Sequence, residues 1–131
     1  MRWYHYVAYF FAGAFLANTL PHLGNGISGH AFQSPFASPP GVGLSSAMVN
    51  VLWGLFNLVV AYLLVCRVGS FNLRNTRHVL ILGAGILIMS LMLAHTFGSL
   101  HGGQWACFVS GVTVWRTRIK LNRCILIEVE V

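Results

Sequence analysis

The residues of this sequence best suited to chemistry are its histidines. His22 and His30 stand on either side of a glycine-rich stretch, and His95 and His101 lie near the end of a third apolar run. Neutral imidazole is a common ligand of zinc, copper and haem iron. We therefore expect these four histidines as candidate ligands of a transition metal or a haem. The alternative is that they are structural or interfacial, because no H-x-x-x-H or H-E-x-x-H spacing is present.

The glycine-rich stretch between the first two histidines reads GNGISG and matches the pattern G-x-G-x-x-G. In a dinucleotide-binding fold this pattern follows a strand and is paired with an acid about 20 residues later. Here it follows an apolar run and Pro21, and the first acid is Glu128. We therefore interpret Gly24, Gly26 and Gly29 as residues of a tight loop. An anion-binding nest of backbone N–H groups is the alternative.

A stripe of small and polar residues runs along the second apolar segment at helical spacing. Its central members are Asn50, Gly54 and Asn57, and Asn18 lies in the first segment. Membrane helices pack through small residues and bond through asparagine. We interpret these four residues as a helix-packing interface, with a polar cavity or transport pathway as the alternative. Either arrangement must bury the amides together, because unpaired polar groups are costly in lipid.

Acidic residues are almost absent, which excludes several functions. The only two are Glu128 and Glu130, close to the end of the chain. A carboxylate proton relay, a Ca²⁺ cage and a paired-carboxylate hydrolase therefore have no residues to use. No spacing selects a Ser/His pair, so the sequence favours a protein that is not an enzyme. Nucleic-acid binding is not expected either, since no basic face with interleaved aromatic residues is present.

Composition places the chain in a lipid bilayer. Hydrophobic residues make up 56% of it and charged residues 8%, whereas soluble domains carry about 25% charged residues. Three apolar runs, residues 3–20, 47–66 and 79–97, are long enough to span a membrane, and residues 98–115 form a probable fourth span. Pro21 is expected to end the first helix. Ser45 or Ser46 should cap the second, and Asn75-Thr76 the third.

Arginine distribution sets the expected orientation. The segment 67–78 contains three arginines, whereas the segment 21–44 contains no arginine or lysine. The positive-inside rule therefore places the N-terminus and the 67–78 loop in the cytoplasm and the 21–44 loop outside. A fourth span would bring the basic segment 116–131 to the cytoplasmic side. Alternating residues in that segment favour a short β-like tail.

These observations predict an all-α membrane protein. Residues 1–115 form a bundle of three to four transmembrane helices with a Gly/Pro-rich outer loop, and residues 116–131 form the basic tail. The expected function is that of a multi-pass integral membrane protein without enzymatic activity, acting as a scaffold, accessory subunit or binding protein. The alternatives are a histidine metal or haem protein and a small transporter of neutral or anionic solutes. The expected partners are the bilayer and either further copies of the chain or a larger membrane complex.

Overall fold

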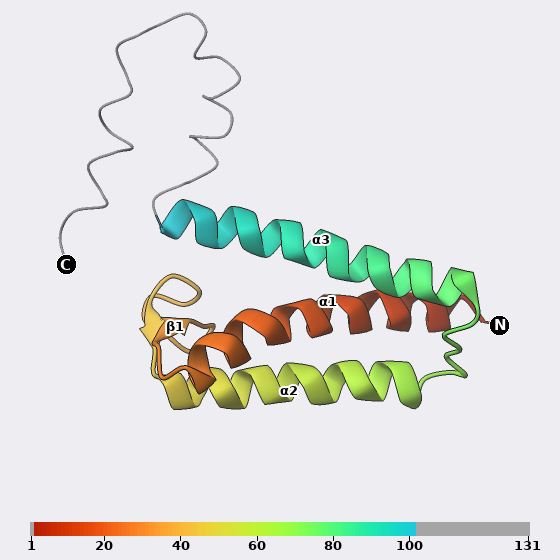
Figure 1. Cartoon of the computed structure of the whole chain (residues 1–131), viewed down its shortest axis with the longest axis horizontal. Coiled ribbons are helices and arrows are strands. Elements are labelled where there is room, and N and C mark those ends of the chain that lie inside the picture. Colours follow the sequence, from red (N-terminus) through yellow and green to blue (C-terminus); the bar gives the residue numbers. More distant parts are fainter. Residues whose placement is uncertain (1, 102–131) are drawn as a thin grey trace, which may run out of the picture. The chain divides into compact units, whose positions relative to one another are not determined.

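The computed structural model describes residues 2–101, which are mostly helical (Figure 1). The elements in chain order are α1 (Trp3–Ile27), β1 (Phe32–Gln33), β2 (Leu44–Ser45), α2 (Ala47–Cys66) and α3 (Thr76–Leu100). The chain divides into two units, Met1–Leu93 and Ala94–Val131, and each is described by itself. Most of the expected fourth span and the whole basic tail lie outside the described residues, so both stay predictions.

The first helix continues past Pro21 and ends at Ile27. Proline removes a backbone donor and usually ends or kinks a helix. In α1 the carbonyl oxygen of Pro21 accepts a hydrogen bond from Nδ2 of Asn25 at 2.8 Å. Membrane helices tolerate proline where neighbouring groups or local adjustments satisfy the backbone carbonyl that proline leaves without its donor. The prediction that Pro21 ends this helix is therefore wrong, and Gly24 and Gly26 are helical rather than part of a loop.

The starts of the other two helices follow local signals in the sequence. Ser46 caps α2, and its side chain accepts a hydrogen bond from the backbone N–H of Val49. At the start of α3, Oδ1 of Asn75 accepts from the backbone N–H of Arg77 at 3.1 Å. Both caps were predicted, because a short polar side chain can satisfy N–H groups that lack a helical partner. Helix α2 also has the predicted bounds, whereas α3 extends beyond the predicted span at both ends.

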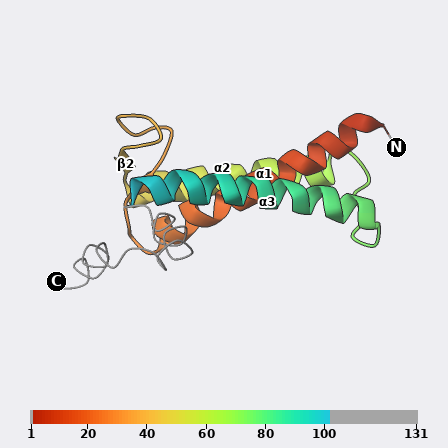
Figure 2. The ribbon, with the colours of Figure 1, turned by 90° about the horizontal axis from the view of Figure 1, so that it is seen from above.

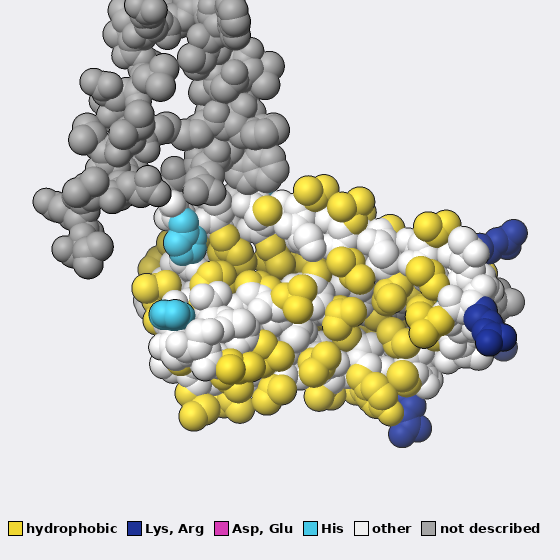
Figure 3. Space-filling view, viewed as in Figure 1, with side chains coloured by type: hydrophobic (Ala, Val, Ile, Leu, Met, Phe, Trp, Pro, Cys, Tyr) yellow, Lys and Arg dark blue, Asp and Glu magenta, His cyan; other side chains and the backbone are white. Residues whose placement is uncertain are grey.

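Residue polarity in this structure is the reverse of that in a water-soluble protein. The buried residues of α2 are Asn50, Gly54, Asn57 and Ala61, whereas large side chains such as Leu52 are exposed. Figure 3 shows hydrophobic side chains along the helices and Lys and Arg side chains at one end. In the described residues, α2 and α3 are long and apolar enough to cross a membrane. These features support a membrane location, while the count of three to four spans stays a prediction.

Helix α1 contacts both of the other helices within the first unit (Figures 1 and 2). Two glycines bring α1 and α3 together. A Cβ atom on Gly13 would overlap the backbone carbonyl of Leu82, and one on Gly85 would overlap the carbonyl of Phe10. Small residues at a crossing let the backbones of membrane helices approach closely. The position of α3 beside α1 therefore depends on both glycines.

Replacing Gly85 with alanine should separate α1 from α3 and lower stability. The added methyl group meets backbone that cannot rotate away, and overpacking of this kind costs about 1–3 kcal/mol. Gly24→Ala is the matched control, because Gly24 is helical and has open space where its Cβ would be. Thermal unfolding in detergent, followed by circular dichroism, should show a lower midpoint for G85A only. Equal midpoints for the two variants would contradict the close crossing.

Candidate functional site

The best-defined polar site lies where a short hairpin covers one end of α1 and α2. Strands β1 and β2 pair antiparallel, with Phe32 opposite Ser45. Next to this pairing, the hydroxyl groups of Ser34 and Ser45 form a hydrogen bond of 2.6 Å, and both side chains are buried. The hairpin therefore presents backbone carbonyl groups and hydroxyl groups to the helices, at the level of the first turn of α2.

Asn50 connects the three elements. Its side chain is fully buried, and Nδ2 lies 3.1 Å from each of the carbonyl oxygens of Phe32, Ser45 and Ser46. Three acceptors around one atom identify it as the amide nitrogen, so Oδ1 faces His22. Nδ1 of His22 lies 2.8 Å from that oxygen and must donate. The bond therefore selects the tautomer of His22 that carries its proton on Nδ1.

A second amide pair lies deeper along the same helix interface. Nδ2 of Asn18 donates to Oδ1 of Asn57 at 3.0 Å, and Asn57 in turn donates to the carbonyl of Trp53 at 2.7 Å. Between the two amide groups, a Cβ on Gly54 would lie 2.7 Å from Cγ of Leu23. Asn18, Asn50, Gly54 and Asn57, the four residues selected from the sequence, thus lie together where α1 meets α2. We call them, with His22, the amide cluster.

The four candidate metal-binding histidines have different surroundings. His22 is buried in the amide cluster, and His30 is exposed just after α1. His95 and His101 lie in the second unit, whose position relative to the first is not described. Within residues 2–101 there is no group of three or more His, Cys, Asp or Glu side chains that could hold a metal ion. Binding of a metal or haem by the four histidines stays a prediction.

The sequence analysis missed a cluster at the opposite end of the first unit. Tyr9 is fully buried, and its ring centroid lies 5.0 Å from that of Phe71 and 5.1 Å from that of His78. Nδ1 of His78 accepts a hydrogen bond from the backbone N–H of Asn72 at 3.1 Å. Aromatic residues near the start of the chain resemble an interfacial belt in sequence. Only the fold shows that one of them holds the loop between α2 and α3.

Glycines 24, 26 and 29 do not form the expected loop. The first two lie in α1, and a Cβ on Gly26 would be within 3 Å of the backbone of Ala47 and Val51 in α2. Gly29 lies beyond the helix with a φ of 79°, a conformation that glycine adopts without strain. Gly26 therefore serves helix packing and Gly29 the turn that follows α1, whereas Gly24 has open space where its Cβ would be.

No protein-family model matches this chain, and no curated protein or solved structure matches it either. The arrangement of the residues is therefore the evidence for function. In the amide cluster, the side chains of Asn18, Asn50 and Asn57 bond to one another's helices and to the hairpin. Because these amide groups bond to other groups of the protein, they hold the elements together and are not free to contact a solute. The arrangement therefore favours a helix-packing interface over a polar pathway.

Replacing Asn50 with alanine should destabilise the protein far more than replacing Asn18. The first change removes the partner of the His22 imidazole and of the Ser45 carbonyl group. At about 1–2 kcal/mol for each buried group left unpaired, the loss is about 2–4 kcal/mol. Asn18→Ala removes one interhelical bond, worth about 0.6–1.7 kcal/mol in membrane proteins. Unfolding in detergent should rank the variants in this order, and similar losses would show that Asn50 does not connect the three elements.

Proposed function

We propose that this chain is a small multi-pass integral membrane protein without enzymatic activity, which binds another membrane helix through α3. It would act as a scaffold or accessory subunit. The observation that carries the proposal is the surface of α3, where only His78 and Gly85 are buried. Both of these face α1, so the other side of the helix has no partner within the first unit.

The unpartnered side of α3 has the composition of a helix-binding surface. Gly83 is exposed, with open space where its Cβ would be, and Ser90 is exposed one heptad later. At about 100° per residue, these two positions share a face, and Gly83 lies about 200° from Gly85 around the helix. Small residues and hydroxyl groups drive association of membrane helices, because they permit close approach and hydrogen bonding. A helix surface that contacts only lipid requires neither small residues nor hydroxyl groups.

The same face carries large apolar residues that could surround a partner helix. Leu80, Leu87 and Leu91 are all exposed. Leu80 and Leu87 lie about one turn to either side of Gly83, so a partner helix that approaches at the glycine would lie between two larger side chains. We name Gly83, Ser90 and these three leucines the α3 face. The amide cluster offers no comparable surface, since its polar groups are bonded within the chain.

A large side chain at position 83 should disrupt the association of α3 with another helix. Wild-type protein, extracted from its native membrane in mild detergent, should migrate on native gels as a complex larger than one chain. Gly83→Leu should shift it toward the single chain, because the side chain occupies the space that the partner needs. Val59→Leu is the control, since Val59 is exposed on α2. Wild-type protein that migrates as a single chain, or a G83L complex that is unchanged, would remove the support for this function.

The proposal includes an orientation with the N-terminus and the 67–78 loop in the cytoplasm. Ser28 follows α1 and Ser70 lies between α2 and α3, and both are exposed. Each can be changed to cysteine in a background where Cys66, Cys107 and Cys124 are serine. A membrane-impermeant thiol reagent should label S28C in intact cells and S70C only after permeabilisation. Labelling of both from the same side would contradict the topology.

A further inference from the structure

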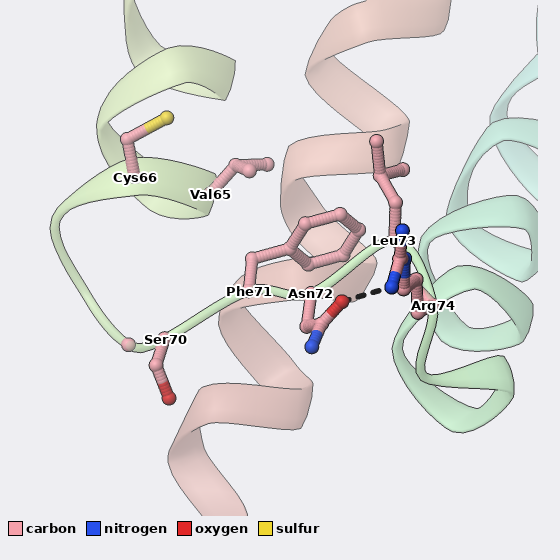
Figure 4. A pocket seen from close by; sticks show the side chains of 8 residues that line it. Val65, Cys66, Ser70, Phe71, Asn72, Leu73 and Arg74 are labelled. Atoms are coloured by element: carbon pink, nitrogen blue, oxygen red, sulfur yellow. Dashed lines mark hydrogen bonds between the residues drawn. The ribbon is translucent and has the colours of Figure 1, made fainter.

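A hollow opens at the end of α2 that the proposed function does not use (Figure 4). It has a volume of about 810 Å³ and extends from the last turn of α2 to the approach of α3. Its lining residues are Val65, Cys66, Gly69, Ser70, Phe71, Asn72, Leu73 and Arg74. This volume is within the range of about 300–1,000 Å³ typical of small-molecule sites. Because α2 is apolar enough to cross a membrane and ends at Cys66, the hollow would lie at the level of the lipid head groups.

The hollow has a basic surrounding. Arg74 lines it, and Arg67 and Arg77 are exposed and close to the lining residues in the sequence. Figure 3 shows Lys and Arg side chains gathered at this end of the first unit. The two acids of the chain are Glu128 and Glu130, so no carboxylate in residues 2–101 can neutralise these guanidinium groups. Anions are therefore the ligands that this surface favours.

Hydrogen bonds and ring contacts hold the loop around the hollow in one shape. Oδ1 of Asn72 accepts from the backbone N–H of Arg74 at 2.8 Å, and the carbonyl of Asn72 accepts from Asn75 at 3.0 Å. Phe71 points toward α1, where its ring packs against Tyr9 (Figure 4). The backbone that carries Arg74 is thus positioned before any ligand binds, which lowers the entropy lost on binding.

We infer that the hollow binds the phosphate of an anionic phospholipid. Arg67 and Arg74 supply the charge, and Ser70, which lines the hollow, supplies a hydroxyl. A lipid is favoured over a free anion because the hollow begins at the apolar end of α2, where Val65 continues the acyl-chain environment. This inference goes beyond helix binding through α3 and rests only on the membrane location.

Native mass spectrometry of the full chain in detergent tests the inference, with phosphatidylglycerol and phosphatidylcholine as probes. The wild type should bind the anionic lipid preferentially. Arg67→Gln with Arg74→Gln should weaken that binding about 25-fold, at about fivefold for each arginine near the membrane surface. Ser70→Ala should weaken it further without loss of helix content. Arg2→Gln is the control, since Arg2 donates to Tyr4 outside the hollow, and it should bind like the wild type.

Each other result would overturn the site. Equal binding of the two lipids excludes recognition of the anionic head group. Losses in R2Q as large as in the double variant indicate general surface charge instead of a site. Displacement of the lipid by millimolar inorganic phosphate would reassign the hollow to a free anion. The same spectra resolve single chains from complexes, so a failure of lipid binding is distinguished from a failure of association through α3.

Discussion

The structure depends on the need to pair polar groups where no water is available. Asn50 meets that need at the point where three elements converge, because its amide donates to the hairpin and accepts from His22 on α1. At such a buried site, a carbonyl or N–H group left unpaired costs about 1–3 kcal/mol. The hairpin cannot leave α2 without exposing such groups, so one side chain determines how the connector between α1 and α2 is folded.

The same environment explains why the interior is built from small residues. Large apolar side chains gain nothing by leaving lipid for a protein interior, so packing between helices depends on close contact and hydrogen bonds. The glycines at 13, 54 and 85 give that contact, and the buried amide groups at 50 and 57 give the bonds. The large leucine and phenylalanine side chains remain exposed along the helices, and this is the surface that we propose lipid or another helix covers.

The two ends of the first unit serve different purposes. At the hairpin end, the buried polar side chains form hydrogen bonds with one another. The segment 21–44 at this end contains no arginine or lysine. At the other end, Arg74 lines an open hollow, and residues 2–101 contain no carboxylate side chain that could neutralise it. The hydrogen bonds at the hairpin end stabilise the fold. The hollow beside Arg74 is the part that we propose binds an anionic lipid.

The sequence by itself determined what depends on neighbouring residues. The bounds of α2, the caps at Ser46 and Asn75, and the single face shared by Asn50, Gly54 and Asn57 follow from local spacing. Tertiary structure decided which groups meet. His22 reaches Asn50, 28 positions away, only because α1 continues past Pro21 and carries the imidazole around to α2. Tyr9 and Gly69 likewise meet only when the loop folds back onto α1. Such pairings depend on how the helices pack, and no local pattern records that.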